Sequence, residues 1–96
     1  IELDHVDLAF EEYSERHEEI VSKVLKEISL LSDRSRDIMN GVFVEGLKYR
    51  EVAERYGISI STVKTLVATS VKKLRERLND EIVASFLLFF HGFNFK

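Results

Sequence analysis

The chain contains no cysteine and no proline, and only four of its 96 residues are glycine. Without cysteine it cannot form a disulfide or a thiolate metal site, which suits a protein of the reducing cytoplasm. Without proline, and with little glycine, it has few residues that end or kink a helix. The composition therefore favours long, uninterrupted helices.

The chain also lacks segments that would direct it to a membrane or across one. Its N-terminal stretch is acidic and has no apolar run, so we expect no signal peptide. The apolar tail EIVASFLLFFHGFNF, residues 81–95, is shorter than the ~20 residues that a membrane-spanning helix needs. The chain begins at Ile1 rather than Met, which suggests a fragment of a longer protein. Its length suits one domain with one modest core.

Charge is segregated along the chain. Residues 1–47 carry twelve acids and five bases, a net charge of −7, whereas residues 48–78 carry eight bases and three acids, a net charge of +5. The overall charge of −3 hides this contrast. A basic segment behind an acidic one is typical of a chain that uses one part to bind a polyanion such as nucleic acid.

Apolar residues recur in alternating steps of three and four, as on one face of an α-helix. The clearest stripe runs from Phe10 to Leu31. His17 lies on this stripe, and we expect it to be packed rather than to bind a metal, because no other ligands stand at metal spacing. Four further helices are predicted: from Ser32 or Asp33 to Gly46, from Tyr49 to Tyr56, from Ser59 to about Leu78, and from Asn79 or Asp80 onward.

These helices predict an all-α fold without strands. We expect an N-terminal linker and first helix over residues 1–30, a central helical unit over 31–78, for which the corner described next predicts DNA binding, and an apolar C-terminal helix over 79–96. The central unit belongs to the small helical class with a helix-turn-helix, similar to winged-helix proteins but without a wing.

A sharp corner lies within YREVAERYGISISTVKTL, residues 49–66. Gly57 can take the left-handed conformation that ends a helix abruptly. Ala53 is small enough to let the two helices approach, and Ile58 and Val63 supply the buried residues of the angle. This spacing predicts a helix-turn-helix, whose second helix enters the DNA major groove. A helical corner without a DNA role is the alternative, and the local basic charge argues against it.

Several motifs in the central unit occur together and in a fixed order. They are LSDRSRDIMNGVFVEGLKYREVAERYGISISTVKTL at residues 31–66 and VKKLRERL at residues 71–78. With this order, residues 30–78 resemble the C-terminal, region-four domain of bacterial extracytoplasmic-function (ECF) sigma factors. The resemblance implies binding to the promoter −35 element and to the β-subunit flap of RNA polymerase core. It also implies sequestration by an anti-sigma factor.

The resemblance places the DNA-reading residues on the second helix of the corner. The positions that match are Ser61, Thr62, Lys64, Thr65, Ala68 and Thr69, and Tyr49 and Arg50 match positions that hold backbone phosphates. Lys64 can donate to guanine, while Thr62 and Thr65 can reach a phosphate or a thymine methyl group, and Ala68 leaves room for a base edge.

Three positions depart from the family pattern. Lys48 replaces the usual Ser, so only the Glu51 half of a capping box remains. Leu66 and Thr69 stand where many relatives carry Arg or His, which removes charge from the groove-facing helix. We therefore expect weak DNA binding by this fragment alone.

Other classes of protein share some of these features. A LuxR-type response-regulator output domain has a similar four-helix layout and a similar TVK signature, but the first helix, the KKLRE ending and the Phe-rich tail favour a sigma factor. A protein-interaction module that has lost DNA binding is a third reading, suggested by Leu66. An enzyme fits least well, because His5, His17 and His91 share no motif and no glycine-rich phosphate loop is present. We expect no cofactor and no metal.

The apolar tail predicts a helix that folds back on the first one. Its stripe consists of Ile82, Phe86, Phe89, Phe90 and Phe93, and Val83, Leu87 and Leu88 add apolar surface beside that stripe. One small core cannot cover all of these side chains. We therefore expect mixed use of this helix, partly as core and partly as a surface for an anti-sigma factor, polymerase or another copy, with self-association of the isolated fragment.

Overall fold

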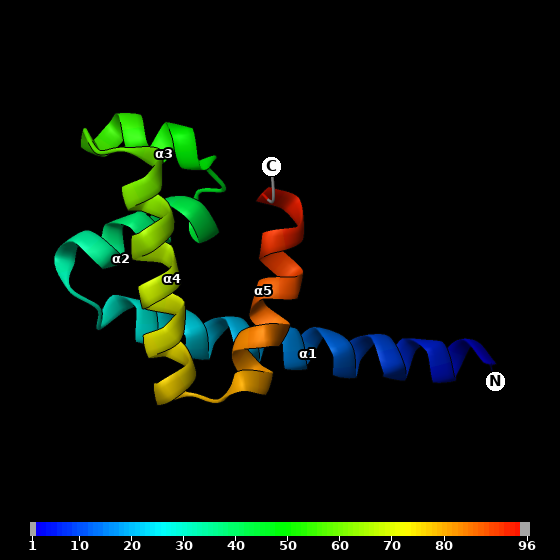
Figure 1. The fold of residues 1–96 in the computed structure, drawn as a ribbon. Coiled ribbons are helices and arrows are strands. Elements are labelled where there is room, and N and C mark those ends of the chain that lie inside the picture. Colours follow the sequence, from blue (N-terminus) through cyan, green and yellow to red (C-terminus); the bar gives the residue numbers. More distant parts are fainter. Residues whose placement is uncertain (1, 95–96) are drawn as a thin grey trace.

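Five α-helices and one π-helical segment make up the fold (Figure 1). The structure is a computed structural model that describes residues 2–94, with side chains described for residues 15–88. The elements are α1 (Glu2–Ser29), α2 (Asp33–Met39), the π-helix η1 (Asn40–Val44), α3 (Tyr49–Tyr56), α4 (Ile60–Arg77) and α5 (Asp80–Asn94). Residues 2–94 contain no strand, so the predicted all-α fold with a long N-terminal helix is confirmed.

The segment between α2 and α3 differs from the single helix that the sequence predicts. From Asn40 onward the helix widens into a π-helical turn, in which the Glu45 amide donates to the Asn40 carbonyl at 2.9 Å. Gly41 lies in this turn, and a Cβ atom there would stand only 3.3 Å from a methyl group of Val52 on α3. The absent side chain thus lets η1 and α3 pack closely, and the helix ends before Gly46, as predicted.

The core is assembled from all the helices. Its fully buried apolar side chains come from α1, α2, η1, α3, α4 and α5, and include Val24, Ile28, Ile38, Met39, Val42, Val52, Val63, Leu74, Val83 and Phe86. On α1 the buried residues follow the predicted helical stripe, and His17 on the same stripe is half-buried. Phe10 and Tyr13, at the N-terminal end of that stripe, lie outside the described side chains.

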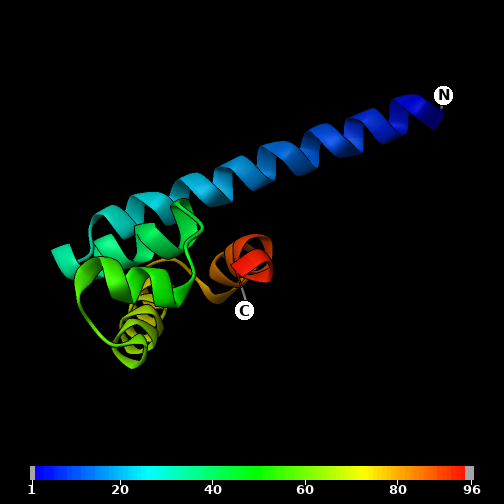
Figure 2. The same ribbon diagram turned by 90° about the horizontal axis from the view of Figure 1, so that it is seen from above.

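Helix α1 packs against three of the other helices. It contacts α2, α4 and α5 through its C-terminal half. Its N-terminal half runs past the rest of the molecule (Figure 2), which accounts for the longest dimension of 56 Å. The C-terminal end of α4 and the N-terminal end of α5 lie on the side of the molecule where α1 lies (Figure 1). Helix α3 lies at the opposite end of α4. The α3–α4 corner is therefore held away from α1.

Helix α5 folds back on α1, as predicted, and also packs against α4 and η1. Val83 and Phe86 are fully buried, and the Phe86 ring lies 5.5 Å from that of Phe43. The sequence placed Val83 beside the buried stripe; it is in fact part of the core because α5 contacts three neighbouring elements. Leu88 is 80% exposed, and the side chains of Phe89, Phe90 and Phe93 lie outside the described residues. No described helix is both long and apolar enough to span a bilayer.

Ser70 on α4 is a buried polar residue whose hydroxyl has no hydrogen-bond partner among the described residues. A buried hydroxyl without a partner costs free energy, and alanine is also the better helix former. We expect Ser70→Ala to raise the free energy of unfolding by about 1 kcal/mol, which for a domain of this size raises the Tm by ~4–8 °C. Thermal unfolding followed by circular dichroism measures this, with the exposed Ser22→Ala on α1 as the control for helix propensity. A lower Tm for Ser70→Ala would show that the hydroxyl is bonded.

Candidate nucleic-acid interface

The corner between α3 and α4 is built around Gly57. Its φ is 65°, in the left-handed region that glycine adopts without strain. The amide of Ile58 donates to the Ala53 carbonyl at 3.0 Å, and the amide of Gly57 donates to the Glu54 carbonyl at 3.4 Å. These two bonds form a Schellman motif, which ends α3 within one residue. The predicted helix-turn-helix corner is therefore present, with α3 ending at the predicted residue.

Both helices of the corner begin at a defined residue. At the start of α3 the Lys48 amide donates to Glu51 Oε1 at 2.8 Å. The Lys48 ammonium has no lone pair, so the reciprocal bond of a capping box cannot form, as the sequence predicts. At the start of α4 the Ser59 hydroxyl accepts a hydrogen bond from the Thr62 amide at 3.0 Å. These bonds determine where α4 starts, and therefore which of its residues come first.

The inner sides of α3 and α4 pack together in the core. Val52 and Ala53 of α3 are buried, as are Val63 and Val67 of α4. Leu66 is half-buried and packs against the same core. Its apolar side chain is therefore accounted for by packing, and it need not mark a surface that has lost DNA binding.

An ion pair that the sequence does not reveal holds the loop before α3. Nη1 of Arg55 lies 2.9 and 2.8 Å from the two carboxylate oxygens of Glu45, ten residues earlier in the chain. The hydrogen bond to Glu45 raises the pKa of Arg55, so its guanidinium stays charged. Both side chains are partly exposed, so the pair adds little to stability. The pair does neutralise the charge of Arg55. The other cation of α3, the exposed Arg50, has no ion pair among the described residues.

The six positions predicted on α4 share one exposed face. Each is exposed, and they lie opposite the buried Val63, Val67, Ser70 and Leu74. The six are Ser61, Thr62, Lys64, Thr65, Ala68 and Thr69. Among the described residues, no acid lies within ion-pair distance of Lys64, so its ammonium is available to a ligand. The structure thus brings these residues together, and their contact with DNA stays a prediction.

The two positions predicted on α3 differ in environment. Arg50 is exposed, whereas Tyr49 is half-buried and packs against the core. Burial raises the pKa of the Tyr49 phenol, so the hydroxyl remains a neutral hydrogen-bond donor at physiological pH. Tyr49 therefore serves packing at least in part, while Arg50 at the start of the helix is free to meet a phosphate.

Further cations follow along α4. Lys72, Lys73 and Arg75 are exposed. Arg77 is exposed as well, and it lies 3.9 Å from Glu27 of α1, so part of its charge is balanced within the protein. The exposed cations extend the basic surface of α4 beyond the six predicted positions.

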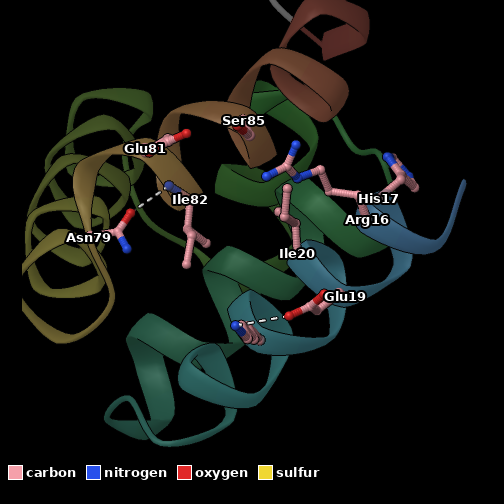
Figure 3. Close-up of a pocket in the computed structure, with 9 residues that line it drawn as sticks. Arg16, His17, Glu19, Ile20, Asn79, Glu81, Ile82 and Ser85 are labelled. Atoms are coloured by element: carbon pink, nitrogen blue, oxygen red, sulfur yellow. Dashed lines mark hydrogen bonds and ion pairs between the residues drawn. The ribbon is translucent and has the colours of Figure 1, made fainter. Parts of the chain in front are cut away.

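A cleft of about 350 Å³ lies elsewhere, between α1 and the start of α5 (Figure 3). Arg16 and Glu19 of α1 line it together with Glu81 and Ser85 of α5, so charges of both signs face it. Two further lining residues already bind other groups of the protein. The Asn79 side chain accepts a hydrogen bond from the Ile82 amide at 2.8 Å, and Lys23 forms an ion pair with Glu19 at 3.2 Å. Within residues 15–88 no group of His, Asp and Glu could hold a metal ion. The α3–α4 surface remains the stronger candidate site.

Comparison with known protein families decides between the readings of this corner. The family model for sigma-70, region 4 matches residues 28–76, just over half of the chain. The chain belongs to the sigma-70 region 4 family. This region 4 domain is thus a DNA-binding domain of a transcription initiation factor rather than a catalytic one. The match covers α2, η1, α3 and most of α4, which are the elements of the candidate interface. No curated protein and no solved structure matches the chain significantly.

Proposed function

We propose that this region 4 domain reads the promoter −35 element with the N-terminal half of α4 while it is bound to RNA polymerase core. The observation that carries the proposal is the exposed face of α4 opposite its buried face, held at the end of the Gly57 corner. Lys64 supplies a hydrogen-bond donor to a base, and Arg50 supplies a phosphate contact from α3. The exposed Lys72, Lys73 and Arg75 add electrostatic attraction without sequence preference.

We further propose that the parent protein is an ECF sigma factor of the cytoplasm. The support is the ordered set of motifs EGL, EVAERYGIS, STVK and KKLRE. As that resemblance implies, the partners are the β-flap of RNA polymerase and an anti-sigma factor. The family match weighs against a LuxR-type output domain. The packing of Leu66 removes the observation that suggested an interaction module without DNA binding. The 80% exposed Leu88 supports self-association of the isolated chain through α5.

Lys64→Glu tests the recognition-helix assignment. The substitution replaces the ammonium donor of Lys64 by a carboxylate, which has the same negative charge as DNA. We therefore expect the affinity of the holoenzyme for its −35 duplex to fall by roughly 10- to 100-fold. The duplex is the one most enriched from a randomised pool by the wild-type holoenzyme. Fluorescence anisotropy over a salt series measures the affinity, which should fall as salt rises because phosphate contacts release counterions.

The control is Lys26→Glu on α1, which changes the net charge equally at an exposed position away from α4. We expect this control to change the affinity far less than Lys64→Glu does. If Lys64→Glu has no effect beyond that of Lys26→Glu, α4 does not present Lys64 to DNA and the proposed recognition helix is wrong.

A further inference from the structure

All three threonines of the chain, Thr62, Thr65 and Thr69, lie on the exposed face of α4. Their hydroxyl groups are engaged by neighbours in the same helix or at its cap. The Thr65 hydroxyl donates to the Ser61 carbonyl at 3.1 Å, and the Thr69 hydroxyl donates to the Thr65 carbonyl at 2.9 Å. The Thr62 hydroxyl lies 2.8 Å from that of Ser59, the N-cap residue. The hydroxyls of this face thus bond first to the helix itself.

This bonding changes what the threonines offer to DNA. A hydroxyl has a single hydrogen to donate. In Thr65 and Thr69 that hydrogen goes to a backbone carbonyl, so it is not available to guanine, thymine or a phosphate. What each side chain leaves for a ligand is its methyl group. Ala68, exposed between them on the same face, adds a third methyl group. Around Lys64, the face therefore presents methyl groups, and of the two contacts that the sequence left open for Thr65, phosphate or thymine methyl, the structure favours the second.

In the DNA major groove the only apolar group that a base pair presents is the 5-methyl group of thymine. We propose that Thr65, Ala68 and Thr69 select thymine by contact with this methyl group, and that Lys64 supplies the adjoining hydrogen bond. This inference rests on the proposed function, and it narrows that function to a site with thymines opposite the middle of α4. A phosphate or guanine contact by the threonine hydroxyls would require them to break their bonds within the helix.

The lone pairs of the same hydroxyls could instead accept from the amino group of adenine or cytosine. The two readings separate cleanly, because valine keeps the shape and a methyl group of threonine but has no oxygen, whereas serine keeps the oxygen but loses the methyl group. Thr65 is the best position for both substitutions, since it is exposed and is bonded only to the backbone of its own helix.

The experiment compares thymine with uracil, which differs from it only by the missing 5-methyl group. The duplex most enriched from a randomised pool by the holoenzyme is synthesised with thymine and, at each thymine in turn, with uracil. We expect one or more positions at which uracil weakens wild-type binding about fourfold, the value for burial of one methyl-sized group. At the position facing Thr65, Thr65→Ser should lose the preference for thymine over uracil and Thr65→Val should retain it. Ser22→Ala on α1 serves as the unaffected control.

The wild-type comparison alone can overturn the inference, since it needs no variant to fold. Sequence-selective binding with equal affinity for thymine and uracil duplexes would refute the methyl contact and leave the proposed function intact. Loss of the preference in Thr65→Val together with its retention in Thr65→Ser would assign the contact to the hydroxyl instead. Failure of the pool to yield any enriched duplex would overturn both this inference and the proposed function.

Discussion

Phe86→Ala should destabilise the domain strongly, by about 3–5 kcal/mol. Phe86 is 1% exposed, and its ring contacts that of Phe43 in the core. Truncation removes a large apolar side chain from the place where α5 meets its neighbours and leaves a cavity there. Because domains of this size are stable by only about 5–15 kcal/mol, the loss is a large part of the total. Urea unfolding followed by circular dichroism measures it.

Leu88→Ser on the same helix is the matched control. Leu88 is 80% exposed, so at concentrations at which the chain is monomeric its replacement should change the free energy of unfolding by less than about 0.5 kcal/mol. In sedimentation over a concentration series, the same variant should shift the isolated chain toward monomer if α5 mediates self-association. Equal losses of stability in Phe86→Ala and Leu88→Ser would contradict the orientation of α5 described above, in which Phe86 faces the core and Leu88 faces solvent.

The sequence predicted the corner of the interface well because its signals are local. The residue at which α3 ends is determined by Gly57, and the start of α4 by the Ser59 cap, and both are readable within a few residues. The six DNA-facing positions of α4 came from the family resemblance, and the structure shows that they are exposed on the side opposite Val63, Val67 and Leu74.

What the sequence could not supply depends on contacts between distant residues or on side-chain conformation. The Glu45–Arg55 ion pair joins residues ten positions apart across a loop. The π-helical turn brings Gly41 close to Val52 of α3, a contact between distant residues that no local pattern encodes. For Thr65 the sequence left a phosphate contact and a thymine methyl contact both open, and the hydrogen bonds that the Thr65 and Thr69 hydroxyls donate within the helix favour the methyl contact.

Gly57→Val should lower the free energy of unfolding by roughly 1–3 kcal/mol. At φ 65° a β-branched residue is strained, whereas glycine is not. A Cβ atom at Gly57 would have no heavy atom within 4 Å, so the expected loss comes from the backbone conformation alone and not from a clash. Thermal unfolding should show a lower Tm, by ~4–8 °C for each kcal/mol lost.

Two substitutions separate this backbone effect from a steric one. Gly57→Asn should cost clearly less than Gly57→Val, because asparagine tolerates the left-handed conformation. At Gly41 a steric effect opposes helix propensity: alanine favours a helical backbone by up to about 1 kcal/mol, but its Cβ atom would stand 3.3 Å from a methyl group of Val52, so we expect Gly41→Ala to gain less than that. Because Gly57 sets the direction in which α4 leaves the corner, we expect Gly57→Val to weaken duplex binding by the holoenzyme as well. An unchanged Tm in Gly57→Val would mean that the chain can turn this corner without a left-handed glycine, and Gly57 would then not determine the position of α4.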